Sequence, residues 1–116
     1  MEDRFLQQMK KGVLELVVLE LLCAKPSYGY ELLVALREKS DGLFALKEGT
    51  LYPILYRLED EGLIRAAWSQ GEGRSMPKKI YEATPLGLEA HMRRRALWQE
   101  FRSSVDSILT GGQENG

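Results

Sequence analysis

The chain has 116 residues, of which 44% are hydrophobic and 28% charged, and its formal net charge is −1. This length suits one globular domain, and the composition excludes a disordered chain. One cysteine and one histidine exclude a disulfide framework and a metal cluster within a single chain, and the near-neutral charge argues against a domain that is basic as a whole, as most nucleic-acid binders are.

No segment is typical of a membrane span or a secretion signal. The longest apolar stretch, residues 13–24, contains Glu15 and Glu20 and is too short to cross a bilayer. The N-terminus is acidic, unlike a signal peptide, so we expect a cytoplasmic protein. No nucleophile–base pair, metal cluster or phosphate-cradling loop is visible, so we expect neither an enzyme nor a cofactor.

The first two predicted elements are helices. The first runs from about Phe5 to Ala24 and is apolar nearly all round, which predicts a central helix that can also meet a second subunit. Pro26 ends it, and the hydroxyl of Ser27 is expected to cap the next helix. That second helix is expected to end at residues 40–42, Ser-Asp-Gly.

The third predicted helix, from about Glu48 to Glu61, has the clearest amphipathic pattern. Pro53 is tolerated only near the first turn, which places the helix start close to Glu48. Gly62 suits the left-handed position after the helix end. The apolar positions recur at helical spacing and predict a buried face: Leu51, Ile54, Leu55 and Leu58.

Two strands and a long helix complete the chain. The strands are expected over residues 63–69 and 78–84, joined by a loop, and Thr84-Pro85 then opens a helix to about Leu109. Three helices, a hairpin and a long helix predict a mainly α fold with a small β-hairpin, a winged helix-turn-helix. We expect the following domains: a DNA-binding winged helix over 1–84, a dimerisation helix over 85–110 and a disordered tail over 111–116.

The last helix carries an apolar seam at 3-4-3 spacing, which is typical of a helix that pairs with another helix. Its members are Trp98, Phe101, Val105 and Ile108. The seam could instead pack only on the first helix within a monomer. We favour a homodimer, because so small a body cannot cover so long a helix.

The side of the third helix opposite its apolar face is the expected DNA-reading surface. Two tyrosines at the start of the second helix are further candidates, although either ring could belong to the core. The wing tract, residues 73–81, contains three positive residues and no acid, which suits contact with phosphates. The competing interpretation is a solvated surface. The candidates are Tyr28, Tyr30, Thr50, Tyr52, Pro53, Tyr56, Arg57, Arg74, Lys78 and Lys79.

Several segments carry a resemblance to a known family. They are SYGYEL at 27–32, EGTLYPILYRLE at 48–59, GLI at 62–64, PKKIY at 77–81 and TPLG at 84–87. With these segments the chain resembles the PadR family of winged-helix transcriptional regulators, and its single helix after the wing resembles the short-tailed branch. The resemblance implies a homodimeric DNA-binding regulator, usually a repressor, and some short-tailed members bind a flat aromatic or cationic compound between subunits.

Trp98 resembles the tryptophan that stacks on ligands in those members. Two copies across a dyad could sandwich a planar compound, with Leu6, Met9, Val13 and Phe101 lining the remainder. The alternative is that Trp98 is only interface core. The expected function is a homodimeric repressor on a palindromic operator, with a small planar aromatic ligand as the candidate releasing signal. The alternative function is a winged-helix protein-interaction module without sequence-specific DNA binding.

Overall fold

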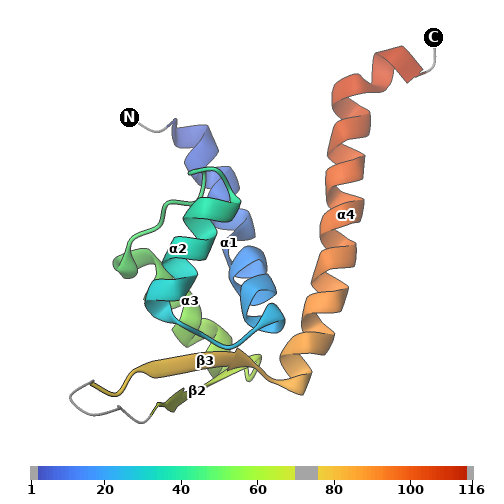
Figure 1. The fold of residues 1–116 in the computed structure, drawn as a ribbon. Helices are drawn as coiled ribbons and strands as arrows, with labels where there is room; N and C mark the ends of the chain where they lie inside the picture. Colours follow the sequence, from blue (N-terminus) through green and yellow to red (C-terminus); the bar gives the residue numbers. More distant parts are fainter. Residues whose placement is uncertain (1–2, 70–75, 115–116) are drawn as a thin grey trace.

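The structure is a computed structural model that describes residues 3–69 and 76–114. Within these residues the chain forms four helices and a three-stranded antiparallel sheet (Figure 1). The predicted mainly α winged-helix fold is therefore confirmed. In chain order the elements are α1 (Arg4–Ala24), β1 (Ser27–Tyr28), α2 (Gly29–Lys39), α3 (Glu48–Asp60), β2 (Ile64–Trp68), β3 (Lys79–Ala83) and α4 (Pro85–Glu114). We call β2, β3 and the segment between them the wing.

The core forms around α1, as its apolar surface predicts. Helix α1 contacts α2, α3, β3 and α4, so it is covered on several sides. The predicted apolar face of α3 is buried throughout, with Leu51, Leu55 and Leu58 fully enclosed. Tyr81 of β3 is 1% exposed and closes the core from the sheet side. No helix among the described residues is long and apolar enough to cross a membrane.

The sheet contains a strand that the sequence does not predict. Strand β1 has two residues, and Ser27 pairs with Tyr81 of β3 in the strand order β1-β3-β2. The expected capping role of Ser27 is wrong, because its hydroxyl donates to the carbonyl of Lys25 at 3.3 Å and the N-cap residue is Tyr28. Glu31 stabilises this helix start by accepting the backbone N–H of Tyr28 at 2.8 Å.

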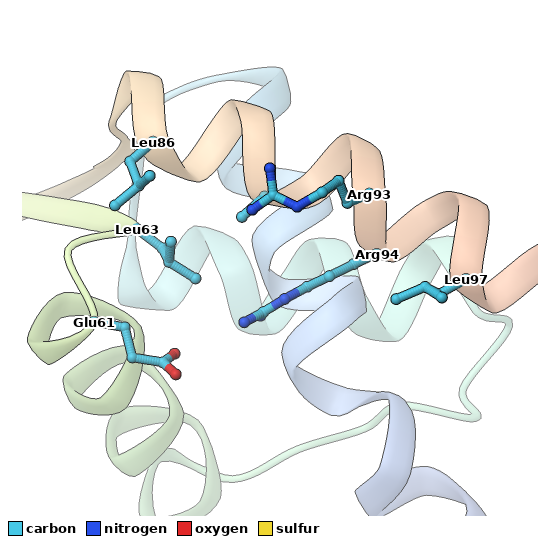
Figure 2. A pocket seen from close by; sticks show the side chains of 7 residues that line it. Glu61, Leu63, Leu86, Arg93, Arg94 and Leu97 are labelled. Atoms are coloured by element: carbon cyan, nitrogen blue, oxygen red, sulfur yellow. The ribbon is translucent and has the colours of Figure 1, made fainter.

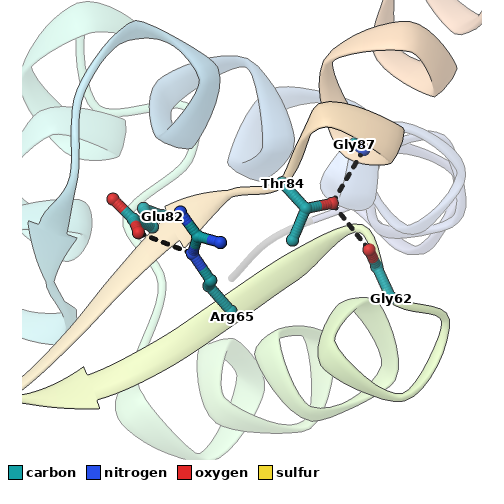
Figure 3. A network of polar contacts seen from close by, with 5 residues as sticks. All are labelled: Gly62, Arg65, Glu82, Thr84 and Gly87. Carbon is teal, nitrogen blue, oxygen red and sulfur yellow. Dashed lines mark hydrogen bonds and ion pairs between the residues drawn. The ribbon is translucent and has the colours of Figure 1, made fainter.

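The start of α4 is fastened to the turn between α3 and β2 (Figure 3). The hydroxyl of Thr84 donates to the carbonyl of Gly62 at 2.6 Å and accepts the N–H of Gly87 at 3.0 Å. The backbone N–H of Thr84 donates to the carbonyl of Leu63 at 3.0 Å. These contacts, which we call the Thr84 clasp, confirm Thr84 as the cap of α4. Gly62 has φ +77°, as its place after a helix end requires.

Helix α4 is longer than the sequence indicates. It continues to Glu114, so residues 111–114 are helical and the expected start of a disordered tail at 111 is corrected. Two consecutive glycines suggest an end because each weakens a helix interior by about 1 kcal/mol. The backbone ladder nevertheless continues through them. Most of α4 extends away from the body of the domain (Figure 1), which leaves its C-terminal half exposed.

Candidate nucleic-acid interface

A groove of about 750 Å³ lies between the outer side of α3, the start of α2 and the wing. Most of its lining is aromatic, and two lysines stand at its wing side. We call it the aromatic groove, lined by Tyr28, Tyr30, Tyr52, Tyr56, Trp68, Tyr81, Lys78 and Lys79, with Gly29, Glu31 and Pro77. Six of the ten residues predicted to contact DNA line this groove. These six residues are Tyr28, Tyr30, Tyr52, Tyr56, Lys78 and Lys79.

Helix α3 supplies one wall of the groove. Burial of its apolar face turns the opposite side outward, where Thr50, Pro53 and Tyr56 are exposed and Tyr52 is half-buried. The rings of Tyr52 and Tyr56 are adjacent, with centroids 6.2 Å apart. The N-terminal half of α3 therefore presents hydroxyl groups and a proline ring, without an acidic side chain between Thr50 and Tyr56.

The wing supplies the positive charge of the groove. The ammonium group of Lys78 lies 5.2 Å from the ring centroid of Tyr28, and that of Lys79 lies 5.5 Å from the ring of Tyr81 and 5.9 Å from that of Tyr56. Such cation–π contacts hold the two charges over the groove. Arg74, the third predicted wing cation, lies outside the described residues.

Two tyrosines of the groove, Tyr52 and Tyr81, are shaped by their surroundings, one in position and the other in protonation. A Cβ atom at Gly29 would lie 2.9 Å from Cζ of Tyr52 and would overlap its hydroxyl, so glycine lets this ring reach the start of α2. Burial, followed by the nearby Tyr56, Tyr52 and Glu59, raises the pKa of the Tyr81 phenol to about 12. The phenol of Tyr81 therefore remains neutral at physiological pH.

Two side chains, Arg57 and Trp68, differ from the predicted set in whether they line the groove. Arg57, a predicted DNA contact, donates from Nε to Glu15 of α1 at 3.0 Å and does not line the groove. The other oxygen of Glu15 lies 3.8 Å from Arg94 of α4. Trp68 was not among the predicted contact residues, and it is 69% exposed and lines the groove. Strand alternation places Trp68 on the same face as Ile64, but it cannot reveal where the helices stop covering that face.

The expected seam on α4 is uncovered in the single chain. Phe101 is 64% and Ile108 81% exposed, and Trp98 and Val105 are also exposed. The rings of Trp98 and Phe101 lie 6.4 Å apart. The expected ligand-lining residues of α1 differ in exposure: Met9 is exposed, whereas Leu6 and Val13 are half-buried.

A second cavity, of about 430 Å³, lies where α4 passes the end of α3 (Figure 2). Leu63, Leu86 and Leu97 provide an apolar lining, together with Ala90. Figure 2 shows Arg94 extending from α4 across this space, while Glu61 enters from the end of α3. Arg93 lies 3.6 Å from Glu89 of the same helix.

Comparisons with known proteins agree with this geometry. Residues 18–93 match the model of the "Transcriptional regulator PadR-like family". A transcriptional regulator from Mycobacterium tuberculosis is 35% identical over 72 residues, or 62% of either chain. A PadR family regulator from Eggerthella lenta has a solved structure with a TM-score of 0.80 and 31% identity, covering 90% of this chain and 88% of that one. A PadR-like regulator from Bacillus cereus has a solved structure with a TM-score of 0.75 and 32% identity, covering 88% of this chain and 96% of that one.

Proposed function

Because the chain belongs to the PadR-like family of transcriptional regulators, we propose that it is a homodimeric repressor that binds a palindromic operator. The observation that carries this proposal is the aromatic groove, where the outer side of α3 and the lysines of the wing face the same space. A duplex that receives α3 in its major groove passes a phosphate strand between α3 and the wing. Lys78 and Lys79, which line the groove, would neutralise phosphates of that strand.

Contact with the bases is assigned to the N-terminal half of α3. Thr50 and Tyr56 offer hydroxyl groups to base edges or phosphates, and Pro53 offers an apolar surface. Tyr28 and Tyr30 lie at the start of α2, where they can support the phosphate strand. Arg57 lies outside the groove, where it is exposed and pairs with Glu15, and its predicted contact with DNA stays a proposal.

The homodimer is supported by the uncovered face of α4. A single chain leaves Phe101, Ile108 and Leu109 each more than 60% exposed, and a second copy of α4 would bury them. Two-fold symmetry would double the phosphate contacts and would set two half-sites about 34 Å apart. The operator would therefore be palindromic.

A small planar aromatic ligand at the dimer interface is the proposed releasing signal. Trp98 and Phe101 offer adjacent rings on α4 for stacking. Because α4 diverges from the N-terminal part of α1 (Figure 1), a second copy is needed to close a pocket lined by Leu6, Met9 and Val13. Such a ligand would act by favouring one spacing of the two recognition helices over another.

A salt-dependent binding titration tests the DNA-binding function. The full chain is titrated against the duplex that flanks its gene and against a scrambled duplex. Specific binding is expected to weaken steeply with salt, with a slope of about −3.6 if the two described wing lysines of each subunit contact phosphates. Lys78→Gln should reduce the slope, whereas Lys39→Gln, at the far end of α2, should leave it unchanged.

Two outcomes would contradict the proposal. Equal affinity for both duplexes would favour the alternative, a winged helix that binds other proteins. Loss of a repressor raises transcription. If deletion of the gene instead lowers transcription from the flanking promoter, repression is excluded.

A further inference from the structure

Trp68 is the large aromatic side chain at the outer end of strand β2. It is 69% exposed, although an indole ring is costly to leave in water. Other exposed aromatic groups line the same groove: Tyr30 is 74% exposed and Tyr56 51%. An apolar surface of this kind, next to two lysines, is typical of an interaction site.

The sheet register directs Trp68 into the aromatic groove. Trp68 is paired with Lys79 of β3, and directly paired residues share one face of a sheet. That face is the one turned to the helices, since it also carries the buried Ile64 and Tyr81. Trp68 therefore continues the inner face of the wing beyond the point where the helices cover it.

The backbone around Trp68 is held on both strands. The N–H of Ser69 donates to the carbonyl of Lys78 at 2.7 Å, and the N–H of Lys78 donates to the hydroxyl of Ser69 at 3.0 Å. The indole ring is thus presented from a hydrogen-bonded ladder, so little further ordering is needed when a partner binds.

The chemistry of the site identifies the partner. Lys78 and Lys79 line the same groove as the ring and favour a polyanion, while the ring itself favours an apolar, uncharged surface. A deoxyribose–phosphate strand offers both, since its phosphates alternate with sugars. We infer that Trp68 packs on the deoxyribose of the DNA strand that crosses the aromatic groove. This inference rests on the proposed function and adds a residue that positions the duplex without reading its sequence.

The test compares Trp68→Ala, Trp68→Phe and Lys79→Gln in the full chain, on the operator and scrambled duplexes, at several salt concentrations. Trp68→Ala is expected to bind both duplexes about ten-fold more weakly, equivalent to about 1.4 kcal/mol. Its salt slope should match that of the wild type, because a contact with sugar releases no counterions. Trp68→Phe should retain most of the affinity, and Lys79→Gln should reduce the slope.

Fluorescence gives an independent readout. The chain has two tryptophans, and Trp68→Ala leaves only Trp98 on α4. DNA should change the emission of the wild type and leave that of Trp68→Ala nearly unchanged. Wild-type affinity in Trp68→Ala overturns the inference, and a loss confined to the operator duplex overturns the contact with sugar in favour of a base contact. If the wild type binds neither duplex, the proposed function fails and the inference fails with it.

Discussion

Replacement of Gly87 by alanine is expected to disturb the junction between the wing and α4. A Cβ atom at this position would overlap the carbonyl oxygen of Leu63 and would lie 2.9 Å from its carbonyl carbon and 3.3 Å from its Cα. These are backbone atoms, so no side-chain rotation can relieve the overlap. The same carbonyl accepts the N–H of Thr84 at 3.0 Å and is therefore held in the Thr84 clasp.

The size of the effect follows from these contacts. To bring the carbonyl carbon alone to ordinary contact, at 3.4 Å, requires a shift of about 0.5 Å, and the overlapped oxygen requires more. Overpacking of a folded core typically costs about 1–3 kcal/mol, and each hydrogen bond lost from the clasp costs about 1 kcal/mol. We therefore expect Gly87→Ala to lower the free energy of unfolding by about 3 kcal/mol.

Thermal and urea unfolding followed by circular dichroism measure this change. At a fixed protein concentration the Tm should fall by roughly 10 °C. Gly49→Ala is the matched control, since a Cβ there meets nothing within 4 Å and alanine is the better helix former. If the Tm of Gly87→Ala stays within about 1 °C of the wild type, the close approach has no energetic role and the reasoning is refuted.

Three further outcomes are expected. Thr84→Val should lower the free energy of unfolding by about 1–2 kcal/mol in urea titrations, whereas Thr84→Ser, which keeps the hydroxyl bonded to Gly62, should not. Ile108→Asp should shift the proposed homodimer to monomer in light scattering, because dimerisation would bury the introduced charge in the α4 seam; an unchanged mass would place the interface elsewhere. Burial raises the pKa of Tyr81 from 10.0 to about 12, so the folded state holds this proton more tightly than the unfolded chain. Stability should therefore fall as the pH rises from 10 to 12, and Tyr81→Phe should reduce that fall.

Local patterns predicted the helices and the cap of α4, although not the cap of α2. The 3.6-residue spacing of leucines identified the buried face of α3, because burial follows directly from helix geometry. Thr84-Pro85 and Gly62 marked a helix start and a helix end, since both roles depend on local backbone geometry. Six of the residues predicted to contact DNA line one groove for the same reason: their helix and strand faces are set locally.

Features that depend on distant parts of the chain were not predictable in this way. Glu15, the partner of Arg57, is 42 residues away in the sequence, and nothing near Arg57 indicates that pairing. Strand β1 has only two residues and exists because β3 offers it a partner. The exposure of Trp68 depends on how far the helices extend over the sheet, a property of packing rather than of alternation.

The Thr84 clasp fixes α4 at its start, so a small rotation there moves the far end of the helix like the end of a lever. The helix has 30 residues and rises about 45 Å, at about 1.5 Å per residue. A tilt of about 5° at its base therefore displaces its far end by about 4 Å. That displacement is comparable with the 3.4 Å rise of one DNA base pair. The base of α4 is bonded to the turn that ends α3. In the proposed homodimer, a movement of the far end of α4 at the interface would therefore be similar in size to a shift of α3 by one base pair along DNA.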